Sequence, residues 1–448
     1  MQIKTIITAN IAEVFETSIN KISSPEERDS RILIEHNLCN RSLLWEGDDK
    51  VVITPYPIDK DLFEHNRNVL GYRNVSNLFP ERVGVSLSKA IIEDPILLQQ
   101  VIEIIRNNPG INISPYCVTE KFFSLVNLLR KEGLSFIITE RPAKQANWLV
   151  QYLDSKVGSR IEIGKISNPQ IEIPESFPCR TKEEAINVAR WFYTHGRSSV
   201  IKTNFGESGW GLVMLRKIQF KSMRDLVLYI NKEFRKTQIW DNDLILVEEF
   251  IEPIEESKTQ SPSSELFLSA EKTTITYICN QVLGANGTFF GVAIGKGIMD
   301  QELSNRIHCI STNIGNRFRQ LGYRGFFDID FVHSQQGNLY IIETNMRRTG
   351  GTHVYDTVKF LIGDKWEQRS YALSNDDFTY GISNLSTSEI LTKLSDILYP
   401  IQGGKEGILL SIINRRQPHL GFIIIGETRE RVLGIHTKLI EKFGLQIE

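Results

Sequence analysis

Apolar residues in the first third of the chain occur either in short runs or at helical spacing. The run at residues 49–58, DKVVITPYPI, predicts a buried strand that ends in prolines. Residues 87–108 predict a helix that is interrupted or restarted at an internal proline. Runs at residues 111–117 and 134–140 predict short strands on either side of a helix over residues 120–133, which ends at a glycine. This alternation is typical of an open α/β sheet.

In the middle of the chain, the pattern changes to strands that follow one another closely. Residues 198–205 and 212–218 predict two strands on either side of the glycine-rich turn GESGWG. A helix is predicted at residues 222–236, and residues 300–322 predict a long amphipathic helix whose acidic first turn and basic last turn suit the helix dipole. Further strands are predicted at residues 243–252, 263–269, 273–284 and 287–295.

These patterns predict an α/β and α+β protein with three regions. An open α/β domain is expected over residues 1–150, because proline-punctuated elements begin beyond a boundary near residues 145–155. A central domain is expected over residues 151–370. The tail, residues 371–448, contains two apolar runs and a last helix, which predict a small α/β domain.

Composition and charge exclude several functions. The chain has 448 residues, 41% of them hydrophobic, and its formal net charge of -2 gives no positive field for binding nucleic acid or an acidic membrane. The five cysteines are scattered without CxxC spacing, which fits reduced thiols better than disulfides or a zinc site. No apolar stretch approaches the ~18 residues of a membrane helix, and the N-terminus has no apolar targeting segment. We therefore expect a cytoplasmic protein that binds neither nucleic acid nor membranes.

The segment IKTNFGESGWGLV places Lys202 at a strand end, before Gly206, Gly209 and Gly211. Glycines let the backbone approach a ligand and present consecutive N–H groups to an anion. Because a strand follows, the segment predicts a flap and not a phosphate loop capped by a helix. It matches neither G-x-x-x-x-G-K-[ST] nor G-x-G-x-x-G, two motifs that bind phosphates. Taken alone, a tight hairpin with a surface lysine is the better interpretation.

Two apolar strands, FFDIDFV and LYIIETN, are separated by a glycine turn and predict an antiparallel hairpin. Alternation places Asp328 and Asp330 on one face of their strand, and Glu343 and Asn345 on one face of theirs. If the residue numbers of two residues paired across the hairpin sum to an odd number, Asp330 lies beside Glu343. Two carboxylates and an amide oxygen suit Mg²⁺, which takes one or two carboxylates plus substrate phosphates. The alternative, salt bridges to nearby arginines such as Arg324, leaves adjacent acids repelling one another.

The residues after the hairpin, NMRRTGGTH, add groups that can bind anions. Arg347 and Arg348 can form forked contacts with phosphate or carboxylate oxygens. Gly350 and Gly351 can present N–H groups to an oxyanion. His353 is a general base, a substrate contact or, as is more common for a lone histidine after a glycine turn, a packing residue.

Taken in order, the lysine strand VIKTNFGESGWG, the acidic strand LILVEEFI and the hairpin DIDFVHSQQGNLYIIETNMRR resemble the ATP-grasp superfamily over roughly residues 155–357. Within it, SPSSE, CNQVLGANGTFFG and ETNMRRTGGTH are similar to peptide ligases with a pre-ATP-grasp domain, the pheganomycin-ligase type, and residues 41–71 resemble that domain. The resemblance implies a pre-ATP-grasp domain at residues 1–150, a two-subdomain ATP-grasp domain at 151–370 and a small C-terminal domain.

The resemblance also implies a role for each residue. Asp330, Glu343 and Asn345 would ligate Mg²⁺, or Mn²⁺, between the phosphates of ATP. The backbone at residues 248–250 would hold adenine. Glu248, or a nearby acid such as Glu255, would bind the adenine amine or the ribose, although the insertion PIEESKTQSPSS leaves the ribose acid open. The full set expected to bind ATP is Lys156, Lys202, Gly206, Ser208, Gly209, Trp210, Gly211, Glu248, Glu249, Phe250 and Glu255. The set expected to stabilise the oxyanion and the leaving phosphate is Arg347, Arg348, Gly350 and Gly351.

The implied reaction joins a small-molecule or peptide carboxylate to an amine, through an acyl phosphate and with release of ADP, in natural-product or peptide biosynthesis. Charge on the transferred phosphoryl group is stabilised by cations, so no side-chain nucleophile is needed. A homodimer is left open. Two alternatives are an ATP-grasp kinase with an alcohol or phosphate acceptor, and a nucleotide-binding module without turnover, against which the intact Asp330, Glu343 and Asn345 argue.

Overall fold

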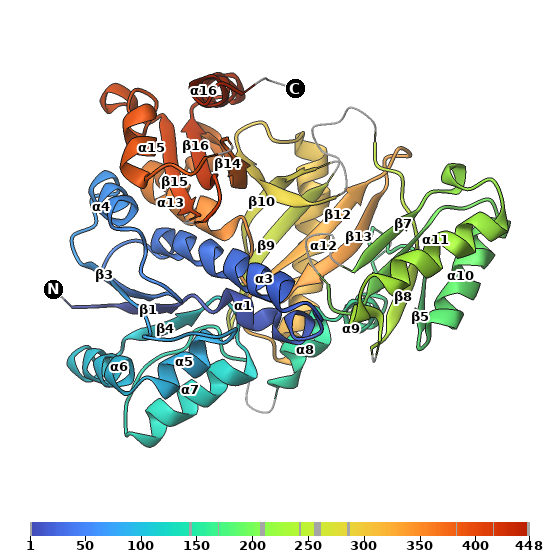
Figure 1. Ribbon diagram of the computed structural model, residues 1–448, viewed down its shortest axis with the longest axis horizontal. Coiled ribbons are helices and arrows are strands. Elements are labelled where there is room, and N and C mark those ends of the chain that lie inside the picture. Colours follow the sequence, from blue (N-terminus) through green and yellow to red (C-terminus); the bar gives the residue numbers. More distant parts are fainter. Residues whose placement is uncertain are drawn as a thin grey trace.

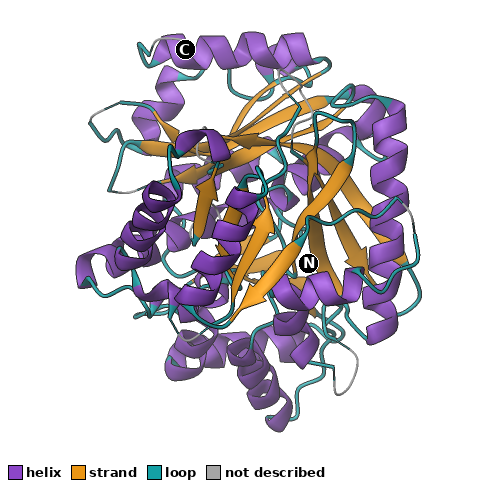
Figure 2. Cartoon of the chain, turned by 90° about the vertical axis from the view of Figure 1, so that its right-hand side faces the viewer, coloured by secondary structure: helices purple, strands orange, loops and turns teal. Residues whose placement is uncertain are grey.

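The strands form three sheets, and helices cover their outer sides (Figures 1 and 2). The computed structural model describes residues 2–142, 146–168, 170–206, 211–241, 243–254, 261–284, 287–381, 383–414 and 416–445. Within these ranges, no helix combines the length and apolar character that a membrane span requires. The mixed α/β architecture predicted from the sequence is present.

The first sheet is parallel, with strand order β3-β2-β1-β4. All of β2 is buried, as its continuous apolar run predicts. The predicted interruption at Pro95 is confirmed, because Asp94 caps a new helix that has this proline in its first turn. The strands are β1 (Thr5–Thr8), β2 (Lys50–Ile53), β3 (Val75–Leu78) and β4 (Asn112–Pro115). The helices are α1 (Ile11–Val14), α2 (Glu16–Ile19), α3 (Pro25–Leu38), the 3₁₀ helix η1 (Cys39–Leu44), α4 (Lys60–Val69), α5 (Leu87–Glu93), α6 (Pro95–Asn107) and α7 (Glu120–Lys131).

The strand predicted at residues 134–140 is not formed. A single parallel bridge joins Asn112 to Ile137, and the Ile137 side chain is 51% exposed. The apolar run therefore lies along the edge of the sheet without adding a strand to it. The half-exposed Ile137 side chain gains little from burial there, which is why the pairing stops at one bridge. Two helices follow, α8 (Trp148–Asp154) and α9 (Lys156–Ile163). Both pack against β13 (Leu339–Asn345), an edge strand of the third sheet described below.

The second sheet is antiparallel, with strand order β5-β8-β6-β7. Its helices pack on one another and on its strands, around a separate apolar core that includes Phe192, Ile230 and Val247. The strands are β5 (Ser176–Cys179), β6 (Ser199–Thr203), β7 (Leu212–Leu215) and β8 (Ile245–Glu249). The helices are α10 (Lys182–Thr194) and α11 (Met223–Arg235), with the 3₁₀ helices η2 (Lys217–Gln219) and η3 (Gln238–Trp240).

The third sheet is antiparallel, with strand order β13-β12-β9-β10-β11-β14-β16-β15. Its strands are β9 (Pro262–Leu268), β10 (Thr273–Leu283), β11 (Phe289–Gly295), β12 (Gly325–His333), β13 (Leu339–Asn345), β14 (Tyr371–Thr379), β15 (Gly407–Ile413) and β16 (His419–Gly426). Its helices are α12 (Gln301–Leu321), α13 (Thr352–Ile362), α14 (Trp366–Arg369), α15 (Thr387–Lys393) and α16 (Arg429–Lys442), with the 3₁₀ helix η4 (Ile401–Gly403). Because β14 pairs with β11, the C-terminal strands continue this sheet. The predicted domain boundaries stay predictions.

One apolar core is shared between the first and third sheets. It contains Ile6 and Ile113 from the parallel sheet together with Leu266, Phe327 and Phe331 from the third sheet. The second sheet, with its own core, lies at the far end of the molecule, at the right of Figure 1. Strands β12 and β13 lie between these two parts.

Candidate functional site

Strands β12 and β13 form the antiparallel hairpin predicted from the sequence. Asp330 pairs with Glu343, and Asp328 pairs with Asn345. The residue numbers of both pairs sum to an odd number, which is the condition under which Asp330 was expected to lie beside Glu343. The register then shifts after Asp330, which makes Ile342 the extra residue of a β-bulge. Bulges are frequent next to functional sites, where they redirect backbone and side-chain groups.

The pKa values of the two aspartates of this hairpin are raised, whereas that of Glu343 is lowered by Lys156 despite burial. Burial, followed by the charges of Asp328 and Glu343, raises the pKa of Asp330 well above its usual value. Burial also raises the pKa of Asp328 to about 7. Gln281 and Asn345 donate to the two oxygens of Asp330, the latter at 3.2 Å, whereas Oδ1 of Asp328 has no hydrogen-bond partner among the described residues. The hairpin thus concentrates buried negative charge, which a divalent cation would stabilise.

Three cations from two other elements lie against the hairpin, and we call Lys156, Arg160 and Lys202 the basic cluster. Lys156 Nζ, on α9, is 2.7 Å from Oε1 of Glu343. The Ile342 carbonyl at the bulge accepts hydrogen bonds from Arg160 at 2.6 Å and from Lys202 at 3.4 Å. The bulge therefore links the hairpin to both α9 and β6.

Glu248 on β8 holds two members of the basic cluster. Its side chain is 0% exposed, and its Oε1 accepts from Arg160 Nε at 2.8 Å, while its Oε2 lies 2.6 Å from Lys202 Nζ. Burial alone would raise the pKa of this carboxyl, but Arg160 and Lys202 outweigh burial and hold the pKa at about 2. Both oxygens of Glu248 thus face buried cations, and the predicted contact of its side chain with adenine or ribose stays a prediction.

The two residues after Glu248 are also engaged with neighbouring elements. Glu249 pairs with Arg197 at 2.6 Å, and the Phe250 amide donates to the Ser198 carbonyl at 3.0 Å. Their contacts with adenine stay predictions. Glu255, the alternative ribose ligand, lies outside the described residues.

The two ends of the glycine-rich segment, Gly206 and Gly211, lie within the described residues. The Gly206 carbonyl accepts from Lys156 at 3.0 Å. Gly211 has a φ of +75°, its carbonyl accepts from the Thr203 amide at 2.9 Å, and an added Cβ would overlap the Thr203 side chain. Glycine is therefore required where the turn closes. The other predicted flap residues lie outside the described residues: Ser208, Gly209 and Trp210.

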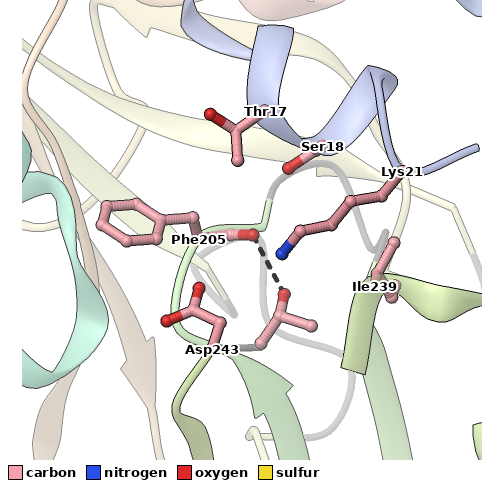
Figure 3. A pocket seen from close by; sticks show the side chains of 7 residues that line it. Thr17, Ser18, Lys21, Phe205, Ile239 and Asp243 are labelled. Atoms are coloured by element: carbon pink, nitrogen blue, oxygen red, sulfur yellow. Dashed lines mark hydrogen bonds between the residues drawn. The ribbon is translucent and has the colours of Figure 1, made fainter. Parts of the chain in front are cut away.

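A small cavity of about 20 Å³ adjoins the start of this segment (Figure 3). The Thr203 hydroxyl donates to the Phe205 carbonyl beside it at 3.1 Å. A volume of ~10–15 Å³ accommodates one water, so this cavity is too small for a substrate. The cavity is lined by residues of α2, of the loop after α2, and of the second sheet with its connections: Thr17, Ser18, Lys21, Thr203, Phe205, Ile239 and Asp243.

Arg348 is buried and binds residues from the first part of the chain. Its side chain is 1% exposed, and its guanidinium donates to Glu46 at 2.6 Å, to Glu140 at 2.7 Å and to Ser114 at 2.8 Å. All three partners belong to the N-terminal domain. These contacts hold the guanidinium among buried groups, and the predicted catalytic role of Arg348 stays a prediction.

Arg347 and His353 differ in their environments. The Arg347 guanidinium lies 5.5 Å from the centre of the Phe15 ring, and its charge opposes the rise in the pKa of Asp328 that burial causes. Arg347 thus lies near the carboxylates, and its catalytic role stays a prediction. His353 is 0% exposed, and burial followed by the Arg41 charge holds its pKa well below the usual value. This neutral, buried imidazole is a packing residue, as the sequence favours.

Gly350 and Gly351 both pack against aromatic rings of the third sheet. An added Cβ at Gly350 would overlap Phe289, and one at Gly351 would overlap Tyr277. Close packing thus accounts for both glycines, and their predicted oxyanion role stays a prediction.

We expect Gly351→Ala to lower the free energy of unfolding by about 1–3 kcal/mol, the usual cost of forcing an extra carbon into a packed core. Urea unfolding measures this difference. Gly434→Ala is the matched control, because Gly434 lies in α16 with no heavy atom within 4 Å of the added carbon. It should be neutral or stabilising by up to about 1 kcal/mol. Equal effects of the two substitutions would contradict the packing explanation.

Sequence reasoning missed Arg160 and Gln281. Arg160 follows Lys156 by four residues in LDSKVGSR, and this spacing puts both side chains on one face of a helix, so the signal was present. Gln281 had no such signal. Gln281 lies on β10 and its partner Asp330 on β12, two strands away in the third sheet, so the contact depends on the order of the strands.

Parts of the chain are similar in sequence to two ligases, although no protein-family model matches it. It is 29% identical over 118 residues to the L-propargylglycine–L-glutamate ligase of Streptantibioticus cattleyicolor, covering 26% of this chain and 23% of that protein. It is 29% identical over 160 residues to the [butirosin acyl-carrier protein]–L-glutamate ligase of Niallia circulans, covering 36% and 35%. The chain thus spans about a quarter to a third of the length of these relatives.

The structural similarity extends over nearly the whole chain. Biotin carboxylase from Campylobacter jejuni superposes with a TM-score of 0.59 at 13% identity, covering 98% of this chain and 91% of that one. N5-carboxyaminoimidazole synthase from Aspergillus clavatus, solved with ADP and 5-aminoimidazole ribonucleotide, superposes with a TM-score of 0.54 at 10% identity, covering 98% and 99%. At these identities, the similarity identifies a shared fold.

Proposed function

From its ATP-grasp fold, which confirms the resemblance seen in the sequence, we propose that this chain is an ATP-dependent ligase that joins a carboxylate to an amine. One observation carries the proposal. The β12–β13 hairpin aligns Asp330 with Glu343, and Lys156 and Lys202 reach this place from two other elements. Cations and acids converging between two domains suit the transfer of a phosphoryl group.

The residues of the hairpin fit a hard divalent cation. Among the described residues, no three acidic, histidine or cysteine side chains form a metal cage by themselves. Mg²⁺ commonly takes only one or two carboxylates and completes its shell with phosphates and water. Asp330, Glu343 and Asn345 would hold it, and the unpartnered Oδ1 of buried Asp328 adds a further negative atom. The bound Mg²⁺, or Mn²⁺ in its place, would supply positive charge to the phosphates of ATP.

The basic cluster would hold the phosphates of ATP. Lys156 and Lys202 are paired with Glu343 and Glu248, and a phosphate oxygen can replace part of either contact. Glu248 holds Lys202 and Arg160 in fixed directions, which lowers the cost of ordering them when the nucleotide binds.

The proposed reaction has two steps. The substrate carboxylate attacks the γ-phosphorus, the bond to the bridging oxygen of ADP breaks, and an acyl phosphate forms. The amine then attacks the acyl carbon, phosphate leaves, and the amine loses a proton. A closed site would exclude the water that otherwise hydrolyses the acyl phosphate. Since both ligases similar in sequence are named for L-glutamate, we propose an amino acid as one of the two substrates.

The test is ADP release measured with amino acids and short peptides supplied singly and in pairs. A ligase should give sustained ADP and phosphate release only when a carboxylate and an amine are both present, with an amide product in the mass spectrum. A kinase would form ADP and a phosphorylated product from one acceptor, without release of phosphate. ATP binding without turnover on any pair would contradict the ligase proposal.

A further inference from the structure

Arg160 joins three elements of the candidate site through one guanidinium. It lies on α9 four residues after Lys156, so the two side chains share a face of the helix. The Arg160 side chain is 6% exposed. Its Nε donates to Oε1 of Glu248 at 2.8 Å, and its Nη2 donates to the Ile342 carbonyl at 2.6 Å. The guanidinium therefore connects α9 with β8 and with the bulge of the carboxylate hairpin.

Arg160 and Lys202 share both of these acceptors. Lys202 Nζ, from β6, lies 2.6 Å from Oε2 of Glu248 and 3.4 Å from the Ile342 carbonyl. One carboxylate thus faces two cations, and its single charge balances only one of them. Arg160 makes the shorter contact with the carbonyl, and its planar guanidinium holds the two donors in fixed directions. When Arg160 balances Glu248, one positive charge is left over at Lys202.

Stability alone does not account for this arrangement. Replacing a buried ion pair by apolar residues of similar volume is often neutral or stabilising, so α9 could pack on β13 without these charges. Two cations at one buried carboxylate also repel each other, which adds a cost. An anion bound beside Lys202 would remove that cost, and the proposed function supplies one in the phosphates of ATP.

We propose that Arg160 is a positioning residue, which engages Glu248 and the bulge carbonyl so that the charge of Lys202 is left for a phosphate of ATP. Within the basic cluster, Arg160 acts through Lys202 and does not itself contact the nucleotide. Without the guanidinium, Lys202 would pair with Glu248 as a neutral unit, and the carbonyl next to Glu343 would lose its shorter contact. This inference rests on the proposed function, because it needs a nucleotide at the basic cluster.

The test is isothermal titration calorimetry of the full chain with Mg²⁺ and the β,γ-imido analogue of ATP, so that binding is measured without turnover. Arg160→Gln should weaken binding of the analogue at least about tenfold, the size of one hydrogen bond to a charged group. AMP, which has a single phosphate, should be weakened less. Arg160→Lys keeps a charge for Glu248 and should bind the analogue more tightly than Arg160→Gln.

A double variant separates the charge of Arg160 from its packing. Adding Glu248→Gln to Arg160→Gln removes the carboxylate that would otherwise pair with Lys202. The double variant should therefore bind the analogue more tightly than Arg160→Gln alone. Thermal unfolding of each variant checks that the fold is kept, and Arg160→Lys carries the test if Arg160→Gln does not fold.

Arg317→Gln is the matched control. Arg317 lies on α12, and its Nε donates at 3.1 Å to Glu162, which belongs to α9 as Arg160 does. The substitution removes an ion pair from the same helix without changing the partners of Glu248. It should leave binding of the analogue unchanged, even if it lowers the unfolding temperature.

Four results would count against the inference, and one of them also against the proposed function. Unchanged analogue binding in Arg160→Gln would overturn it directly. Equal weakening of AMP and the analogue, or an equal effect of Arg317→Gln, would limit Arg160 to holding α9 in place. Weaker binding by the double variant than by Arg160→Gln would contradict the charge argument. If the parent chain itself does not bind the analogue, the proposed function fails together with the inference.

Discussion

Glu343→Gln is expected to reduce ADP formation at least about 100-fold, the order of loss when one preorganised electrostatic group is removed, while the protein stays folded. Glu343 lies opposite Asp330 in the hairpin and 2.7 Å from Lys156. Glutamine keeps the volume and can still accept from Lys156, but it lacks the charge that would hold a divalent cation. The measurement is steady-state ADP release with a substrate pair that supports turnover.

Two comparisons make this prediction specific. Glu367→Gln removes an exposed glutamate from the short helix α14 and should leave the rate unchanged. Thermal unfolding of Glu343→Gln should differ little from that of the parent chain. If the variant forms ADP at the parental rate, the carboxylate hairpin is not the cation site and the enzyme proposal loses its main support.

The second large effect is expected on stability, for Arg348→Met. This substitution leaves Glu140, which is 3% exposed, and the partly buried Glu46 without their shared guanidinium. Removing one partner of a buried ion pair costs about 3–5 kcal/mol, because the remaining charge stays desolvated. Urea unfolding should show a loss of this size. Arg369→Met is the matched control, and it should stay within about 0.5 kcal/mol of the parent because it changes only the surface.

The penalty for Arg348→Met should also depend on pH. Burial raises the pKa of Glu140 from 4.5 to about 7, even though Arg348 opposes the shift. The folded state therefore binds this proton more tightly than the unfolded state, and the contribution of Glu140 to stability falls as pH rises between these values. Without Arg348 the folded pKa rises further, so the loss should be larger at about pH 8 than at about pH 5. A penalty that is the same at both values, or below about 1 kcal/mol, would contradict the ion-pair explanation.

Local pattern was sufficient to predict the hairpin. Alternation fixed which side chains share a face, and the odd-sum register then placed Asp330 beside Glu343, as the structure shows. Lys202 could be placed at a strand end before a glycine-rich turn for the same reason. These features depend on residues close together in the chain, where the period of a strand and the geometry of a turn determine the outcome.

Contacts between residues that are distant in sequence were not predicted. Glu248 was expected to contact the nucleotide, but β8 lies beside β6, and this strand order sets it against Lys202. Arg348 was expected to contact substrate, but its partner Glu46 lies 302 positions earlier. The order of strands in a sheet and the docking of one domain on another leave no periodic signal in the sequence, so neither partner could be inferred.

The core shared by the first and third sheets affects how the chain folds as it is synthesised. Ile113 of the parallel sheet belongs to the same apolar core as Phe327 of β12, which is 214 residues later (327 minus 113). At about 5–20 residues per second, the ribosome needs roughly 10–40 s to add that length of chain. During this interval, the emerging N-terminal strands expose the apolar face that later elements, β9, α12 and the hairpin among them, cover in the finished protein. Nascent chains that end before these elements are therefore expected to expose more apolar surface than the finished protein.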